Sequence, residues 1–194
     1  PPKLAENKLV IVPIYFKDKK AVDGKADKLK HILKEFNPIL DDRDEYKPGF
    51  KFNEWEMKGI PLRVEIGPKD ILKDQAVIVR RDNGKKEFVR TEQLKQKVRL
   101  TLENIQESLL KKAQERLQAG LDKATDWDDF AQKIQEQKMV LAPFCLGHEC
   151  EASIKDQTGA TSVNIPFDQP KEKPKKCIRC KKNASSWVYF NNGY

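Results

Sequence analysis

Four cysteines late in the chain have the spacing of metal ligands. Cys145 and Cys150 form a C-x4-C pair, and Cys177 and Cys180 form a C-x2-C pair. Each pair offers two thiolates from one short turn, and two such pairs can close a tetrahedron around Zn²⁺. His148 lies inside the first pair and could replace a thiolate, while four unrelated reduced thiols are the alternative without a metal. A site with four thiolates has no open coordination position, so we expect a structural metal.

The charged segment 41–70 is the second stretch whose residues could take part in binding or catalysis. It arranges its side chains around two turn signals, Lys47-Pro48-Gly49 and Met57-Lys58-Gly59. Its charged and aromatic members include Asp42, Arg43, Lys51, Phe52, Glu56, Arg63, Glu65, Lys69 and Asp70. Carboxylates accept from base N–H groups, cations bind base acceptors and phosphates, and an aromatic face stacks a base. The segment is typical of a surface that binds unpaired nucleobases; a solvated connection between strands is the other interpretation.

The composition describes a basic chain with room for one good domain or two small ones. The 194 residues are 38% hydrophobic and 35% charged, with a net charge of +8. This charge favours polyanionic partners such as RNA. The longest apolar run, Leu9 to Phe16, is too short to span a bilayer, and no secretory leader opens the chain. Four localised cysteines are too few for a disulfide-stapled secreted domain. Because Pro1-Pro2 opens the chain without Met, we expect a fragment.

The first 90 residues alternate strand and helix patterns, which predicts an α/β sheet. The expected strands cover 9–16, 38–42, 61–66, 75–81 and 86–90, and a short helix covers 50–57. Asp23 is the expected cap of another helix, whose apolar residues extend to Phe36. Asp82-Asn83-Gly84 predicts a tight turn between the last two strands.

From Thr91 the apolar period changes to 3.6 residues and predicts a long helix that ends at Gly120. Its apolar face comprises Leu94, Val98, Leu102, Ile105, Leu109, Ala113 and Leu117. Thr125 with Asp128 predicts the capped start of a further helix, with Trp127 and Phe130 in a core. Strands are expected over 139–142 and 185–190, with a loop over 168–176. We therefore place an α/β domain at 1–90, a connecting helix at 91–120 and a small α+β module at 121–194.

Beyond these patterns, the chain resembles the C-terminal region of prolyl-tRNA synthetases of the archaeal and eukaryotic type. In that family an anticodon-binding domain is followed by a small zinc module, and the resemblance covers essentially the whole chain. It is carried by Asp42-Arg43, residues 48–52, Trp55-Glu56, residues 58–61, Arg63, residues 66–70, residues 165–167 and Tyr194. The resemblance implies a class IIa anticodon-binding fold, a mixed five-stranded sheet flanked by helices.

The resemblance also implies which side chains face the anticodon. The implied set is Phe52, Glu56, Arg63, Lys69, Asp70 and Lys85. Proline anticodons carry guanine as second and third base, and guanine presents two N–H donors beside its O6 acceptor. We expect Phe52 to stack on a base. We expect Glu56 and Asp70 to accept from guanine N–H groups. Arg63, Lys69 and Lys85 are expected to bind O6, N7 or phosphate. Asp42, Arg43 and Glu65 stay open between this role and a buried network that positions the loop.

The rest of the expected enzyme follows from the same resemblance. The catalytic domain, a class II ligase that uses ATP and Mg²⁺, is expected upstream, so we expect no catalytic residue in this fragment. Neither a P-loop nor a Gly-rich dinucleotide fingerprint occurs in the sequence. The implied partners are tRNA(Pro), the upstream domain and a second copy in a homodimer, in the cytoplasm and without a membrane. Zn²⁺ is implied at the four cysteines, and Tyr194 is expected to reach back and support the active site.

Two other functions fit parts of the pattern. A stand-alone tRNA- or RNA-binding module would keep the fold without a catalytic partner. Another class IIa synthetase, for histidine, threonine or glycine, would share the first domain, but the zinc module and Tyr194 favour the prolyl enzyme. Class II motifs upstream of Pro1 would separate a ligase from a stand-alone module.

Overall fold

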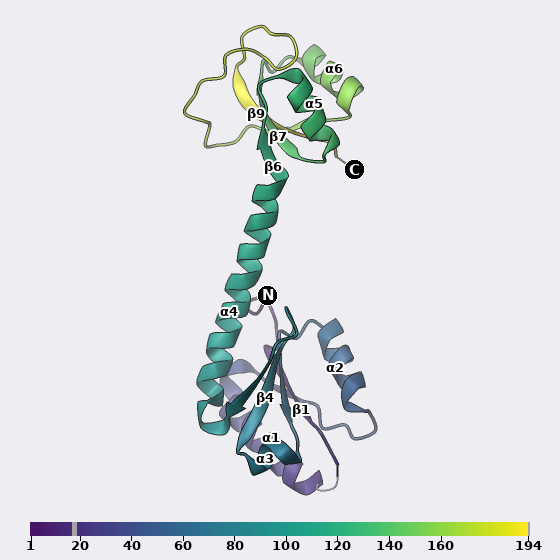
Figure 1. Ribbon diagram of the computed structural model, residues 1–194, viewed down its shortest axis with the longest axis vertical. Coiled ribbons are helices and arrows are strands. Elements are labelled where there is room, and N and C mark those ends of the chain that lie inside the picture. Colours follow the sequence, from purple (N-terminus) through teal and green to yellow (C-terminus); the bar gives the residue numbers. More distant parts are fainter. Residues whose placement is uncertain (17–18, 194) are drawn as a thin grey trace. The chain divides into compact units, whose positions relative to one another are not determined.

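The computed structural model describes residues 1–16 and 19–193 and divides the chain into two compact units, Pro1–Lys112 and Ala113–Tyr194. Each unit has its own sheet (Figure 1) and its own hydrophobic core. Helix α4 (Thr91–Gly120) begins in the first unit and ends in the second, and both of its bounds are as predicted. The division into three parts at residues 90 and 120 stays a prediction. Tyr194 lies outside the described residues.

The first unit is built on a mixed sheet, in which the described residues form five strands. These are β1 (Leu9–Pro13), β2 (Ile39–Leu40), β3 (Leu62–Ile66), β4 (Gln75–Arg80) and β5 (Lys86–Arg90). Their order is β2-β1-β3-β4-β5; β1 pairs in parallel with β2 and β3, and β4 pairs antiparallel with β3 and β5. The expected mixed α/β fold is confirmed.

Alternation along the strands gives the two faces of this sheet different partners, because successive strand residues point to opposite faces. Leu9 and Ile11 join the larger core with α1 (Lys19–Ile32) and the first half of α4. Val10 and Val12 point the other way, where α2 (Pro48–Met57) packs on them. Figure 1 shows α2 and α4 on opposite sides of the sheet.

Several local expectations for the first unit were wrong. Helix α1 begins at Lys19, so Asp23 lies inside it and accepts a hydrogen bond from the Tyr15 hydroxyl at 2.6 Å. A 3₁₀ turn, Lys34–Phe36, then continues the chain. The short helix α3 (Pro68–Leu72) escaped prediction because it is a single turn, too short for an apolar period. In the part of α4 that belongs to the second unit, Leu117 at the end of the predicted apolar face is 58% exposed, so the apolar face ends earlier than expected.

The second unit contains β6 (Leu121–Lys123), α5 (Trp127–Gln135), β7 (Met139–Phe144), α6 (His148–Thr158), β8 (Thr161–Asn164) and β9 (Ser186–Asn191). Its strands have the order β6-β7-β9-β8, with only β6 and β7 parallel among the described pairs. Asp126, not Thr125, caps α5, since its side chain accepts from the Asp128 N–H at 3.0 Å. Helix α6 was not predicted because it buries only Ile154 and shows no apolar stripe.

The described part of the chain contains no helix with the length and hydropathy needed to cross a bilayer.

Candidate nucleic-acid interface and metal centre

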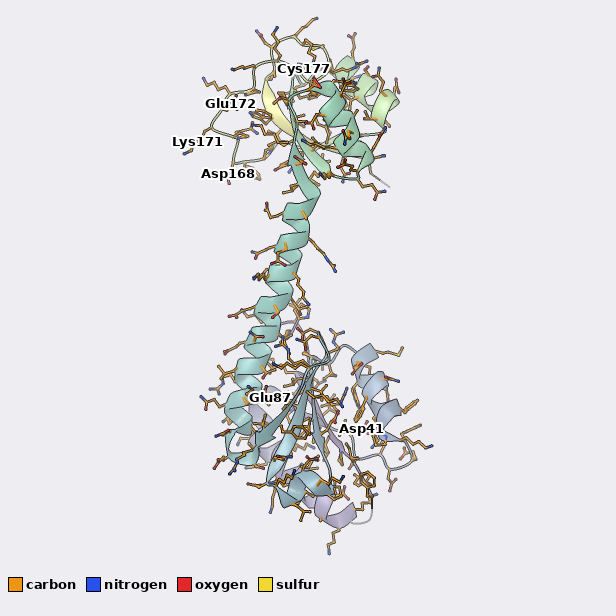
Figure 2. The ribbon with its side chains drawn as sticks, viewed as in Figure 1. Asp41, Glu87, Asp168, Lys171, Glu172 and Cys177 are labelled. Carbon is orange, nitrogen blue, oxygen red and sulfur yellow. The ribbon has the colours of Figure 1, made fainter. Side chains whose placement is uncertain are left out.

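A buried carboxylate just after β2 holds helix α2 against the sheet. Asp41 is 3% exposed and is labelled in Figure 2. It accepts hydrogen bonds from Trp55 Nε1 at 2.7 Å and from Arg43 Nε and Nη2, each at 2.8 Å. Arg43 Nη2 also donates to Glu54 Oε2 at 2.6 Å. Because Glu54 and Trp55 belong to α2, this network fixes the helix to the strand.

A buried lysine on α2 faces the same carboxylate. Lys51 is 1% exposed, its Nζ donates to the Asp41 backbone oxygen at 3.1 Å, and it lies 3.8 Å from Asp41 Oδ1. Burial favours the protonated carboxyl, but hydrogen bonds from Arg43 and Trp55 and the charge of Lys51 outweigh it and lower the pKa of Asp41 to about 2. At neutral pH the interior therefore holds a charged acid between two cations.

Three of the predicted anticodon residues come together beside this network. The guanidinium carbon of Arg63 lies 4.0 Å from the centroid of the Phe52 ring, and Arg63 Nη1 donates to Glu56 Oε1 at 2.7 Å. Arg63 Nε donates to Glu65 Oε1 at 3.0 Å. Arg63 and Glu65 are buried, whereas the Glu56 side chain is 46% exposed. The cluster thus offers solvent a carboxylate whose orientation is set by a buried cation.

Lys69 and Asp70 lie at the other end of β3, where α3 begins. Lys69 is exposed. Asp70 Oδ2 accepts from the Gly67 N–H at 3.0 Å, and Asp70 Oδ1 accepts from Gln75 Nε2 at 3.2 Å. Both carboxylate oxygens of Asp70 therefore have partners within the chain, one of them in the cap of α3. A contact between Asp70 and guanine stays a prediction.

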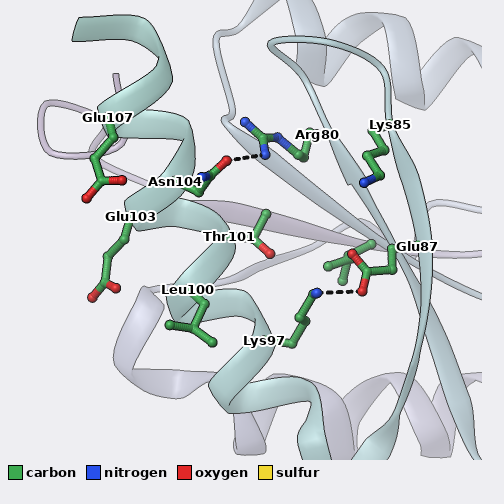
Figure 3. Close-up of a pocket in the computed structure, with 10 residues that line it drawn as sticks. Arg80, Lys85, Glu87, Lys97, Leu100, Thr101, Glu103, Asn104 and Glu107 are labelled. Atoms are coloured by element: carbon green, nitrogen blue, oxygen red, sulfur yellow. Dashed lines mark hydrogen bonds and ion pairs between the residues drawn. The ribbon is translucent and has the colours of Figure 1, made fainter. Parts of the chain in front are cut away.

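The sixth predicted residue, Lys85, points to the opposite face of the sheet. It lines a cavity of about 490 Å³ between the β4–β5 hairpin and α4 (Figure 3). Arg80 Nη1 donates to Asn104 there at 2.6 Å, and Lys97 lies 2.5 Å from Glu87. The structure therefore does not bring Lys85 together with Phe52 and Arg63, and its contact with RNA stays a prediction.

Asp42, Arg43 and Glu65 were left open between contact with the anticodon and a buried positioning network, and the answer differs between these residues. Arg43 and Glu65 lie in the two polar networks that hold α2 and Arg63, as the structural alternative proposed. Asp42 is exposed, and its place in the interior is taken by Asp41, which the sequence reasoning passed over. The spacing of Lys51 and Trp55, four residues apart on a short helix, was the available signal for an inner face.

The four cysteines converge in the second unit, as their spacing predicts. Their sulfur atoms all lie within 4.8 Å of one another, and the Cys145 and Cys180 sulfurs are 3.8 Å apart. A tetrahedron with metal–sulfur bonds of about 2.3 Å has sulfur–sulfur edges of about 3.8 Å, far beyond a disulfide bond. His148 is exposed at the start of α6 and is not in this group of described residues. The four thiols could hold one metal ion.

Local contacts give these thiols very different acidities. Burial raises the pKa of Cys145 and raises that of Cys150 to about 12. The backbone N–H of Lys182 lowers the pKa of Cys180 to about 7. Four neighbouring thiols cannot all become thiolates without a cation between them, so metal binding here would displace protons.

Comparison with known families matches both units. Residues 8–101 match the family described as "Anticodon binding domain", and residues 127–194 match "Prolyl-tRNA synthetase, C-terminal". All of this chain aligns with proteins named proline--tRNA ligase. Identity is 42% over 199 residues in Natranaerobius thermophilus, 43% over 196 in Ruminiclostridium cellulolyticum and 36% over 205 in the cytoplasmic protein of Arabidopsis thaliana. The chain spans 41%, 40% and 38% of these relatives, respectively.

Replacing Asp41 by Asn should destabilise the first unit at pH 7 by about 3 kcal/mol, because the buried cation Lys51 and the half-buried Arg43 lose this anion. In the unchanged chain the lowered pKa contributes about 2 kcal/mol. That contribution is present above the unfolded pKa of 3.8 and is lost as pH falls toward about 2. Asp41→Asn should remove this acid-dependent loss. Hydrogen exchange of α2 and β1 amides across the pH range measures both effects.

Asp42→Asn is the matched control for this measurement, because Asp42 is the exposed neighbour on the same segment. It should leave the exchange rates of α2 close to those of the unchanged chain. An acid-dependent loss of equal size in Asp41→Asn and the unchanged chain would show that another carboxyl is responsible.

Proposed function

The chain belongs to the prolyl-tRNA synthetase family through its anticodon-binding and C-terminal domains, and from this premise we propose its function. We propose that it is the anticodon-reading and C-terminal part of a proline--tRNA ligase, which charges tRNA(Pro) with proline at the cost of ATP. The reaction and its ATP and Mg²⁺ belong to a catalytic domain upstream. The chain spans about two fifths of the relatives it matches, which leaves room for such a domain.

The observation that carries this proposal is the carboxylate of Glu56, held by Arg63 beside Phe52. One carboxylate can accept the N1–H and N2–H donors of guanine together. Proline anticodons have guanine at two adjacent positions. A half-exposed acid of fixed orientation is suited to select that base, because every other base presents a different edge to it.

The remaining predicted residues would support this contact. Two of the five N–H donors of Arg63 serve Glu56 and Glu65, so others can reach guanine O6. Lys69 is exposed near the end of β3 and suits a base nitrogen or a phosphate. Lys85, on the other face of the sheet, suits a phosphate farther along the RNA backbone.

For the second unit we propose a structural Zn²⁺ bound by Cys145, Cys150, Cys177 and Cys180. Their separations and the all-thiolate donor set support zinc. A unit with a small core gains folding free energy from such an ion. The ion has no open position for a substrate, so it takes no part in catalysis.

We also propose the wider assembly that the family relationship favours. The full protein would pair as a homodimer in the cytoplasm, and Tyr194 would contact the upstream catalytic domain and support its active site. These proposals rest on the family alone, since Tyr194 lies outside the described residues.

The zinc proposal predicts about one Zn²⁺ per chain in protein purified without added metal, measured by elemental analysis. Cys177→Ser should lower this content well below one, since it removes a buried ligand, and should loosen the second unit in hydrogen exchange. His148→Ala is the control and should retain the metal. Disulfide-bonded cysteines in a reduced preparation, or a well-folded metal-free second unit, would contradict the proposal.

The RNA proposal predicts that Glu56→Gln reduces discrimination at the middle anticodon base by about 1–3 kcal/mol, because the amide cannot accept both guanine donors. Fluorescence anisotropy with a proline anticodon stem-loop, and with the same loop carrying adenine at that base, measures this difference. Lys85→Ala is the comparison. It should weaken the binding of both RNAs equally and should reduce the slope of log affinity against log salt concentration by about one, the value for one phosphate contact. Equal losses on the two RNAs for Glu56→Gln would refute its assigned role.

A further inference from the structure

Strand β5 places an exposed phenylalanine on the sheet face that carries Arg63 and Glu65. Phe88 is 67% exposed. Across the strands, Phe88 of β5 pairs with Val77 of β4, and Val77 pairs with Glu65 of β3. In the same way, Lys86 pairs with Val79, and Val79 pairs with Arg63. Directly paired residues project from the same face of a sheet. Phe88 therefore shares its face with the Phe52–Arg63–Glu56 cluster, two strands away from β3.

The ring of Phe88 does not belong to either hydrophobic core of the first unit among the described residues. The core on this face gathers under α2 around Val10, Val12 and Ile60, and in the described part of the chain it does not extend to β5. The next residue, Val89, points to the opposite face and joins the larger core there. Folding thus anchors β5 through Val89 and leaves the Phe88 ring in solvent.

Cations flank this ring along the strand. Lys86 and Arg90 lie two residues before and after Phe88 and so project from the same face. Both are exposed; Lys86 reaches Glu65 only at 3.9 Å, and Arg90 has no ion pair within 4 Å among the described residues. An aromatic ring between basic groups suits single-stranded nucleic acid, since a base stacks on the ring while phosphates bind the cations. Isolated exposed apolar residues are common, and these flanking charges distinguish this one.

Phe52, which belongs to the cluster with Arg63 and Glu56, is less available than Phe88. The guanidinium of Arg63 covers one side of its ring at 4.0 Å, and the ring packs partly into the core under α2. Phe88 is the open ring on the same surface. Neighbouring strands lie about 4.8 Å apart, so β5 is about 10 Å from β3, within reach of a base next to one held at Glu56.

We propose that Phe88 stacks on an unpaired base next to the anticodon guanines, with Lys86 and Arg90 binding the phosphates on either side. This inference rests on the proposed function, because it extends the same RNA surface from α2 across β4 to β5. Stacking accepts any base, so Phe88 contributes affinity, while Glu56 contributes the choice of guanine.

The test measures binding of the proline anticodon stem-loop to the unchanged chain and to variants at Phe88, by fluorescence anisotropy. Phe88→Ala should weaken binding about 5- to 100-fold, the range for one stacked base. Phe88→Leu should weaken it similarly, because leucine keeps the apolar surface but has no ring. Phe88→Trp should bind at least as tightly as the unchanged chain. Phe167→Ala, at an exposed phenylalanine of the second unit, is the control and should have no effect.

The outcomes separate this inference from the proposed function. No binding by the unchanged chain, or binding indifferent to the anticodon, would overturn both. Anticodon-selective binding that Phe88→Ala leaves unchanged would overturn the inference alone. If Phe88→Leu binds the RNA as tightly as the unchanged chain, apolar contact and not stacking explains the affinity, and the inference is overturned. Unchanged RNA affinity with weaker self-association in Phe88→Ala would assign the ring to a protein contact instead. Melting temperatures within a few degrees of the unchanged chain confirm that the variants are folded.

Discussion

A carboxylate buried between β2 and α2 keeps its negative charge because Arg43, Trp55 and Lys51 surround it. Few apolar contacts could replace this anchor. Strand β2 has only two residues, and the core under α2 is small compared with the one on the opposite face. The position of α2 therefore depends on a polar network, and α2 carries Phe52 and Glu56. A buried charge that loses its partners is costly, so the network favours one arrangement of the helix.

The strand period of two then determines what the binding face contains. Alternate residues of β3 to β5 enter the core with α1 and α4. The others place the buried pair Arg63 and Glu65 beside α2 and the exposed Phe88 on the edge strand. Helix α2 packs on β1 and also contacts Arg63 of β3 through Phe52 and Glu56. Together, α2 and the strands beside it present a carboxylate held in place by Arg63, an exposed ring and exposed cations. This is the chemistry that unpaired bases and their phosphates require.

The sequence predicted the structure correctly where it contains a regular apolar period or two ligand residues a few positions apart. The limits of α4 and β5 followed from the apolar pattern, and the cysteine cluster followed from two short spacings. It failed where tertiary contacts decide. The role of Asp41 depends on donors from two separate segments, and α6 forms although it buries only Ile154. The resemblance did not indicate where Lys85 lies: its side chain lines the cavity beside α4, away from Phe52 and Arg63, and its contact with RNA stays a prediction.

The direct test of this account is to locate the RNA on the two faces of the sheet by amide chemical shifts. The anticodon stem-loop should shift the amide signals of Phe52, Glu56, Arg63 and Phe88. The signals of Thr101 and Asn104, which line the cavity on the α4 face, should stay unchanged. Shifts confined to Thr101, Asn104 and the β4–β5 hairpin would place the RNA in that cavity and contradict the account.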